Sequence, residues 1–366
     1  MDKLTKFIDV YVPVEACSLR CDYCYITHHR LFASRLPKFQ YDANTFRRAL
    51  SKKRLGGTCL FNFCGGGETL LAPEMPQYIK ALLEEGHYVM VVTNATVSRA
   101  FDEMAHWDKD LIERLFFKFS YHYVELNKRN LFDRFFGNIR KMRDAGASFT
   151  LELTPYDDLI PYIDDIKTRA LAEIGAWPHV TVARDERVMS EKPILTSLSR
   201  EDYYKTWSVF DSALFNFKFS IFGEKRKEFC YAGDWMGYLN MENGMLQQCN
   251  SCLFRQNIFE DITMPIQWIP IGNYCREPHC FNGHAWIGLG GIPSMNAPSY
   301  AEMRNRKCIN GTEWLQPKMK DFLSQRLYDN NVQLTYYGRL NVNITHFCYL
   351  VRRKINRKFT HLFSKA

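Results

Sequence analysis

Three cysteines stand close together near the start of the chain, at Cys17, Cys21 and Cys24 in the segment CSLRCDYC. Thiolates spaced in this way on one loop can hold three irons of a [4Fe–4S] cube. Because the fourth iron is then open, such a cluster can bind and reduce a small molecule instead of only passing electrons. A zinc site is the alternative, and it needs a fourth ligand, which His28 or His29 could supply.

A second motif is the segment FCGGGET, in which Gly65, Gly66 and Gly67 precede Glu68. Glycine lets the backbone approach a ligand closely, and a glutamate accepts charge-assisted hydrogen bonds from an ammonium group. Further polar residues stand where strands are expected to end, although each of them alone is more often a cap or a turn former. These residues are Thr93, Asn94, Ser120, His122, Glu152 and Arg184.

Taken together, these segments resemble the radical S-adenosylmethionine (radical SAM) superfamily. CSLRCDYC is similar to its CxxxCxxC signature, including the aromatic Tyr23 before the third cysteine. The glycine segment is similar to its GGE motif, with Thr69 where the family more often has proline. The resemblance implies that the open iron binds the methionine part of S-adenosylmethionine and that reductive cleavage gives a 5′-deoxyadenosyl radical, which takes a hydrogen atom from a substrate. It also implies cofactor contacts from Tyr23, the glycines, Glu68 and the strand-end residues.

Strands and helices must position these residues. Over the first 190 residues, short strand-like runs alternate with helix-like stretches, as in a parallel sheet covered by helices. Helices are predicted near 43–53, 73–85, 98–106, 130–145 and 159–174. The predicted strands are Phe7–Val12, Thr58–Cys64, Tyr88–Thr93, Phe116–Tyr121, Phe149–Thr154 and Val180–Arg184. Six such units predict an α/β fold, a partial (β/α)6 TIM-like barrel, with its chemistry at the carboxyl ends of the strands.

A second group of cysteines lies in the C-terminal half. Cys230 and Cys249 flank a predicted hairpin, where Asn243-Gly244 favours a tight turn, and Cys275 and Cys280 follow on a loop rich in glycine and proline. Four thiolates saturate a [4Fe–4S] cube. Further side chains could replace one of them, and these are Cys252, as the alternate ligand, His279 and His284.

This second segment resembles the auxiliary-cluster extensions called SPASM and twitch domains, and its five cysteines suit the single auxiliary [4Fe–4S] cluster of a twitch domain. A structural zinc site formed by the same cysteines is the alternative. The predicted domains are therefore a radical SAM partial barrel over residues 1–200, a Cys-rich auxiliary iron–sulfur extension over 201–310, and a helical, basic tail over 311–366.

The bulk composition predicts a globular, cytoplasmic protein. Hydrophobic residues make up 46% of the 366 positions and charged residues 24%, and the pattern shows neither a secretion signal nor a run of about 18 apolar residues. A reducing compartment suits metal binding by cysteines better than disulfides. Ordinary buried thiols are predicted for the scattered cysteines, which are Cys59, Cys64, Cys308 and Cys348.

The last 16 residues, 351–366, carry six Lys or Arg and no acid, within a chain of net charge +8. They are either a frayed, solvated helix end or a basic, partly amphipathic segment that touches an anionic membrane face or nucleic acid. The second interpretation places the protein in contact with the inner membrane face.

For function, we predict a radical SAM enzyme that oxidises or epimerises a sugar, an aminocyclitol or a glycan precursor, with a low-potential flavodoxin or ferredoxin as electron donor. A maturase acting on a peptide or a protein side chain is the alternative within the family. From another class, a zinc-binding module for nucleic acid would explain the cysteines and the charge but not Gly65–Glu68, so no nucleic-acid partner is expected.

Overall fold

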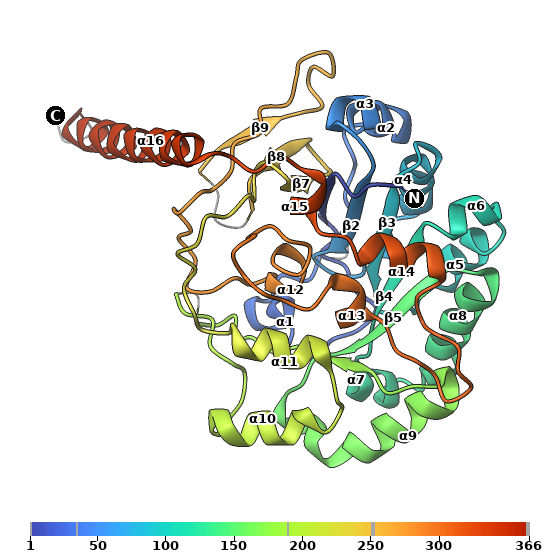
Figure 1. Ribbon diagram of the computed structural model, residues 1–366. Helices are drawn as coiled ribbons and strands as arrows, with labels where there is room; N and C mark the ends of the chain where they lie inside the picture. The colour runs from blue at the N-terminus through green and yellow to red at the C-terminus, as the bar shows by residue number, and fades with distance from the viewer. Residues whose placement is uncertain (1, 34–35, 189, 250–252, 364–366) are drawn as a thin grey trace.

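One sheet of nine strands organises the part of the chain that the computed structural model describes, residues 2–33, 36–188, 190–249 and 253–363. Its strand order is β6-β5-β4-β3-β2-β1-β7-β8-β9 (Figure 1). The strands are β1 Lys6–Val12, β2 Cys59–Gly65, β3 Tyr88–Thr93, β4 Leu115–Ser120, β5 Ser148–Leu153, β6 His179–Val180, β7 Met236–Asn240, β8 Met245–Gln247 and β9 Arg255–Asn257. The first six are parallel, which confirms the predicted α/β fold of a partial barrel.

Helices cover both faces of this sheet (Figure 1). Those before β6 are α1 Tyr25–His29, α2 Ala43–Ala49, α3 Lys52–Leu55, α4 Met75–Glu84, α5 Ser98–Met104, α6 Lys109–Ile112, α7 Tyr123–Lys128, α8 Phe132–Ala145 and α9 Ile163–Ile174, with 3₁₀ turns η1 Thr69–Leu71 and η2 Asp157–Tyr162. Those after β6 are α10 Arg200–Ser208, α11 Ala213–Ser220, α12 Gly283–Trp286, α13 Tyr300–Arg304, α14 Pro317–Leu323, α15 Leu327–Asn330 and α16 Tyr336–Phe363.

Alternate strand residues build two separate cores, because successive side chains of a strand point to opposite faces. Phe61 and Phe117 face outward and pack among α2, α4, α5, α8 and α9. Phe7 faces inward and its ring lies 5.7 Å from that of Trp286, edge to face. The inward ring of Tyr88 likewise stacks on Phe322. The C-terminal third of the chain therefore fills the amino-terminal end of the barrel.

Three predicted elements differ from the observed ones by more than two residues at one end. The strand predicted over 180–184 stops at Val180, because after Thr181 the chain leaves β5 and folds back on itself through a bridge between Arg184 and Ile194. The helix predicted over 43–53 is split into α2 and α3 by the extended backbone of Ser51. The helix predicted over 159–174 begins as η2 and becomes α9 only after Pro161, whose nitrogen cannot donate a hydrogen bond.

The C-terminal half joins the sheet directly. β7 pairs in parallel with β1, from Phe7 opposite Met236 to Tyr11 opposite Asn240. β8 then returns antiparallel to β7, which confirms the predicted hairpin, and Gly244 takes the left-handed φ of +72° that its turn requires. The division into domains at residues 200 and 310 stays a prediction, and the sheet itself runs across the first of these boundaries.

The helix α16 extends away from the rest of the molecule (Figure 1). His346 attaches its first half, since the ring Nε2 lies 2.8 Å from the carbonyl oxygen of Pro270. Cys348 on this helix is exposed, so the prediction of a buried thiol there is wrong, whereas Cys59 is buried as predicted and Cys64 and Cys308 are half-buried. Within the described ranges, no helix is long and apolar enough to cross a membrane.

Candidate active site

The carboxyl ends of the barrel strands and the loops that follow them surround a cavity of about 170 Å³. Leu19, Ile26 and Phe32 supply apolar parts of its wall. The cavity brings together most of the predicted site residues, namely Cys17, Cys21, Tyr23, Cys24, Gly65, Gly66, Gly67, Glu68, Thr93, Asn94, Ser120 and His122. The three thiols thus face the motif residues across one small space.

The loop of the three cysteines is held by polar groups from other elements. The backbone N–H of Arg20 donates to Glu125 Oε2 at 2.8 Å, and Asn94 Nδ2 lies 3.0 Å from Ser18 Oγ and 3.7 Å from Cys17 Sγ. Burial raises the pKa of Cys17 to about 11. Sequence reasoning missed Glu125, because an acid in the first turn of a helix such as α7 is common on protein surfaces.

The three thiols suit the separate irons of an iron–sulfur cube. Among the described residues, no three side chains of His, Cys, Asp or Glu are grouped so that they could hold one metal ion. A cube takes each thiolate at a different iron and so needs no such convergence. His28 and His29, which a zinc site would need, do not line the cavity of the three thiols.

The glycine segment packs against the chain that leads into the cysteine loop. The N–H groups of Gly66, Gly67 and Glu68 donate in succession to carbonyl oxygens of the segment 12–16. A Cβ on Gly67 would lie 2.1 Å from the carbonyl oxygen of Ala16, so a side chain there would force the two loops apart. The glycines therefore allow close contact between two loops, in addition to lining the cavity.

Glu68 joins the glycine segment to the end of β3. Its buried carboxylate accepts hydrogen bonds from Thr93 Oγ1 at 2.6 Å, from the N–H of Asn94 at 2.7 Å and from the N–H of Leu70 at 3.0 Å. Burial raises its pKa, and these hydrogen bonds oppose that rise. Thr69 has a structural role as well, because its Oγ1 accepts from the N–H of Gly65 at 2.9 Å.

Tyr23 and His122 form part of the cavity wall as a pair. The Tyr23 hydroxyl is hydrogen-bonded to His122 Nδ1, and the Tyr23 ring lies 4.6 Å from that of Tyr156. Burial lowers the pKa of His122 to about 4, so the imidazole is neutral at neutral pH. A neutral imidazole can orient the Tyr23 hydroxyl through this hydrogen bond.

Two predicted site residues do not line this cavity. Glu152 forms ion pairs with Lys118, at 2.9 Å, and with Arg304. Arg184 pairs with Glu186 at 3.0 Å. Arg304 comes from α13, far along the chain, and nothing in the sequence pattern indicates that it meets Glu152.

The four auxiliary cysteines meet in a second pocket, whose lining includes Cys230, Cys249, Cys275 and Cys280. Cys230 is tied to the loop of the last two by a pair of backbone hydrogen bonds with Gly272, each 3.0 Å long. Of the side chains weighed as substitutes, His279 lines this pocket and His284 does not, while Cys252 lies outside the described residues.

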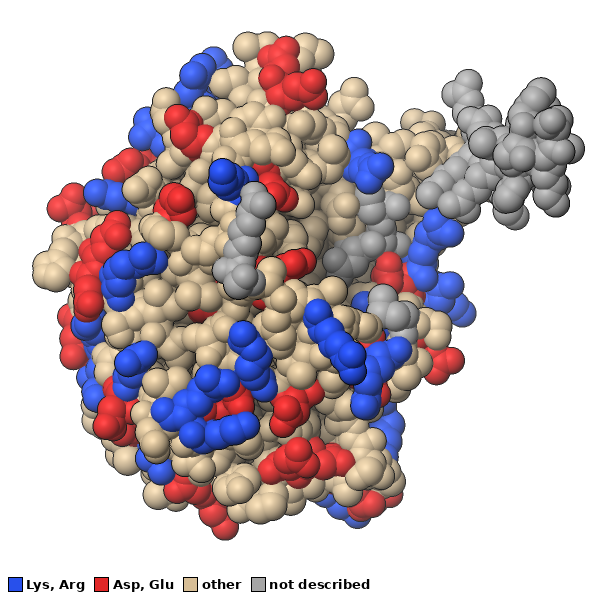
Figure 2. Space-filling view, turned by 180° about the vertical axis from the view of Figure 1, so that it is seen from behind, with Lys and Arg blue, Asp and Glu red and all other residues tan. Residues whose placement is uncertain are grey.

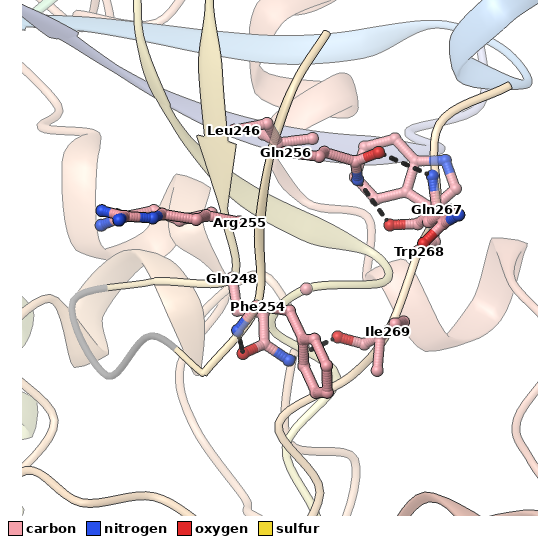
Figure 3. Close-up of a pocket in the computed structure, with 10 residues that line it drawn as sticks. Leu246, Gln248, Phe254, Arg255, Gln256, Gln267, Trp268 and Ile269 are labelled. Carbon is pink, nitrogen blue, oxygen red and sulfur yellow. Dashed lines mark hydrogen bonds between the residues drawn. The ribbon is translucent and has the colours of Figure 1, made fainter. Parts of the chain in front are cut away.

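A small cavity of about 60 Å³ shows how Gln248, the residue before Cys249, is held (Figure 3). The side chain of Gln248 donates to the carbonyl oxygen of Ile269 at 2.7 Å and accepts from the N–H groups of Leu253 and Phe254. Gln256 makes the same kind of two-way contact with the backbone of Gln267. These two amides hold the chain around residues 267–269 against the chain around Gln248 and Gln256. Gln248 directly precedes Cys249, so its hydrogen bonds also fix the position of Cys249 in the chain.

A partial α/β barrel with three thiols, a glycine–glutamate loop and polar strand ends around one cavity is the arrangement expected of the radical SAM class. Residues 11–156 match the family model described as the radical SAM superfamily. The chain therefore carries a radical SAM domain, and this family implies a [4Fe–4S] cluster and S-adenosylmethionine as cofactors.

Several solved structures are similar to this chain at low identity. SuiB of Streptococcus suis is 16% identical with a TM-score of 0.50, over 71% of this chain and 64% of that chain. The enzyme anSMEcpe, solved with AdoMet and the Cp18Cys peptide, is 12% identical with a TM-score of 0.44, over 96% of this chain and 98% of that chain. BtrN with AdoMet and 2-DOIA is 13% identical with a TM-score of 0.28. This chain thus spans about two thirds of the length of SuiB, and no curated protein matches it.

Proposed function

We propose that Cys17, Cys21 and Cys24 hold a [4Fe–4S] cluster at which the protein cleaves S-adenosylmethionine reductively. When bound, the two cofactors supply a 5′-deoxyadenosyl radical that takes a hydrogen atom from a substrate. The observation that carries this proposal is the gathering of the three thiols and the motif residues around one cavity inside the matched domain. A flavodoxin or ferredoxin is the proposed source of the electron.

In this proposal the other residues of the cavity bind and orient. The glycine segment and Glu68 hold the loops at a fixed spacing, and the proposed contacts of the cofactor are with them and with Tyr23, Thr93, Asn94, Ser120 and His122. Asn94 Nδ2 points toward the Cys17 sulfur, and hydrogen bonds to cluster-ligating sulfurs adjust the reduction potential of a cluster. Glu152 and Arg184 lie outside the cavity and are better suited to contacts with the substrate than with the cofactor.

We further propose that Cys230, Cys249, Cys275 and Cys280 hold one auxiliary [4Fe–4S] cluster, as in a twitch domain. Their common pocket supports this, and four thiolates leave no iron open. Such a cluster suits electron transfer rather than ligand binding. A zinc ion at the same cysteines remains the competing proposal.

Anaerobic reconstitution with iron and sulfide tests these proposals together. The enzyme should become brown, hold about eight irons per chain and release 5′-deoxyadenosine from S-adenosylmethionine when dithionite is added. A zinc-binding module for nucleic acid would stay colourless and release no 5′-deoxyadenosine. Retention of zinc through reconstitution at the second site alone would support the auxiliary zinc site.

The substrate class we propose is a sugar, an aminocyclitol or a glycan precursor, which the enzyme would oxidise or epimerise. The inward side chains below the cavity support it, because Asn62, Ser120 and Thr150 offer amide and hydroxyl groups that suit a compound rich in hydroxyls. A peptide or protein side chain is the alternative. Transfer of deuterium from labelled sugars or from labelled peptides into 5′-deoxyadenosine would decide between them.

We also propose that α16 holds this otherwise cytoplasmic protein against an anionic membrane. Large apolar side chains are exposed along one stripe of the helix, at Tyr337, Leu340, Ile344, Phe347 and Val351. The chain from residue 330 onward carries seven Lys or Arg and no acid. A second copy of so basic a helix would be repelled, whereas anionic lipids would be attracted.

Flotation with vesicles of phosphatidylglycerol and phosphatidylcholine tests the contact. The full chain should float with the anionic vesicles, and Ile344→Glu with Phe347→Glu should abolish flotation, because the apolar stripe is interrupted. Neutral vesicles serve as the control. Equal flotation of the double variant, or dimerisation through the stripe in solution, would overturn the membrane contact.

A further inference from the structure

Charged side chains stand on the inner face of the sheet directly below the thiol-lined cavity. Lys118 lies two residues before Ser120 on β4 and so points to the same side as this lining residue. Its Nζ is 2.9 Å from Glu152 Oε1. The exposed fraction of the Lys118 side chain is 16%, whereas Phe116, two residues earlier on the same face of the strand, is fully buried. The interior thus stays open to water as far down as Lys118.

Two more basic side chains, from the C-terminal half, join this group, and one of them pairs with Glu152. Arg304, which is fully buried, pairs with the other oxygen of Glu152, while its Nε and Nη2 have no hydrogen-bond partner among the described residues. Lys218 on α11 donates from Nζ to Thr181 Oγ1 at 2.5 Å. Burial lowers the pKa of Lys218 to about 7, an effect that Glu152 opposes and that the neighbouring cations reinforce.

The positive groups of this cluster outnumber the negative ones. Burial by itself would raise the pKa of Glu152, yet Lys118, Arg304 and the other cations hold it well below its usual range, so this group is a carboxylate. Asp9 faces the same space and is the second negative group, because burial raises its pKa only to about 6 and it is mostly a carboxylate at neutral pH. Asn62 donates to it at 2.7 Å, so three basic side chains face two carboxylates.

The surrounding charges do not alter that balance. Glu186 is shared between Arg184, at 3.0 Å, and Lys192, at 3.1 Å. Burial holds the pKa of His284 well below its usual range, so this ring is neutral. Buried cations without a counter-charge are costly, and a site that holds them is suited to an incoming anion.

We propose that Lys118, Lys218 and Arg304, grouped around Glu152, bind an anionic group of the substrate, a carboxylate or a phosphate, on the floor of the barrel interior. An anion held there leaves the rest of the substrate pointing up toward the thiol-lined cavity. The assignment of the anion to a substrate rests on the proposed radical function. The anion site itself is a property of these side chains.

Calorimetric titration of the reconstituted full chain with inorganic phosphate and with acetate, at constant ionic strength, tests the site. Wild type should bind one anion per chain, and Lys218→Met should bind it at least about tenfold more weakly, the loss expected for one charged hydrogen-bond donor. Lys205→Met is the matched control, since Lys205 is an exposed lysine paired with Glu201 on α10. A preference for phosphate or for acetate identifies the anionic group.

Equal binding by wild type and Lys218→Met, or binding of neither anion by wild type, would overturn the site. A second variant guards against misfolding of the first: Glu152→Gln removes the competing carboxylate and should tighten anion binding several-fold. Unchanged or weaker binding by a folded Glu152→Gln protein also contradicts the site. Release of 5′-deoxyadenosine is measured separately, so anion binding without it would defeat the proposed function and leave this inference intact.

Discussion

The two groups of cysteines in this molecule are assembled in different ways. Cys17, Cys21 and Cys24 come from one loop, and their partners come from neighbouring strand ends of the same barrel. The other four cysteines come from separate segments between residues 230 and 280, which meet through the β7–β8 hairpin and the pairing of Cys230 with Gly272. A site built from local spacing is visible in a sequence, whereas a site built from long-range pairing depends on the fold.

The two sites also differ in what surrounds the thiols. The first cavity is lined by glycines and by polar strand ends that can meet a ligand, such as Thr93 and Asn94. The second pocket is lined by apolar groups such as Ile271, Trp286 and Ile292 around its thiols, and its polar lining residues are Arg226, Glu277, His279 and Asn282. This contrast is the basis for proposing an open cluster in the first site and a fully ligated one in the second.

The largest expected effect comes from removing the first group of thiols. The triple variant with Cys17, Cys21 and Cys24 each changed to Ala should lose about four irons and all release of 5′-deoxyadenosine, because the cube loses every protein ligand. Iron analysis and chromatography of the products measure both. Cys348→Ala, which removes an exposed thiol on α16, should change neither. Cleavage that persists in the triple variant would defeat the assignment.

Removing two auxiliary thiols should separate the sites. Cys230→Ala with Cys249→Ala should also lose about four irons but keep part of the cleavage of S-adenosylmethionine, since the first cluster is untouched. Electron paramagnetic resonance of the reduced protein should then show one cluster signal instead of two. An unaltered iron content would show that these cysteines hold no cluster.

The barrel and the helix α16 each contain a buried histidine, so the stability of each part should depend on pH. His87 in the barrel accepts at Nδ1 from the N–H of Cys59, and burial lowers its pKa to about 4; burial lowers that of His346 as well. Because the unfolded chain takes up the proton near pH 6.5 and the folded one does not, His87 should remove up to about 3 kcal/mol of stability as the pH falls from 6.5 to 4. Thermal unfolding at a series of pH values measures this loss.

The matched variants for that series are His87→Gln and His346→Gln. His87→Gln should flatten the part of the pH dependence that belongs to the barrel, and His346→Gln only the part that belongs to the attachment of α16. An unchanged slope below pH 6.5 in His87→Gln would count against the role of His87.

A smaller effect is expected where Glu68 joins two loops of the first site. Glu68→Gln keeps the shape but turns an acceptor into a donor facing the donors of Thr93 and Asn94, at a cost of about 1–3 kcal/mol in stability. The KM for S-adenosylmethionine should rise, while the iron of the auxiliary site should be unchanged. Glu74→Gln on the exposed surface is the control. A normal KM with normal stability would show that Glu68 does not join the loops in this way.

Much of the barrel could be predicted from the sequence because its strands are short apolar runs bounded by clear stops. Tyr88–Thr93 is predicted to the residue, and Gly146 ends α8 with a left-handed φ of +101° before β5. The predicted elements failed where a single residue changed the local backbone. Pro161 and Ser51 interrupt helices that the apolar pattern alone would continue.

What the sequence determined by itself is the loop of Cys17, Cys21 and Cys24, the glycine segment and their place after parallel strands, because these depend on spacing within a few residues. Only the tertiary structure decided that β7 extends the same sheet, that Arg304 and Lys218 join Lys118 and Glu152 inside the barrel, and that Cys348 is exposed. Those outcomes depend on contacts between residues far apart in the sequence, or on which face of a helix packs, and no local pattern encodes either.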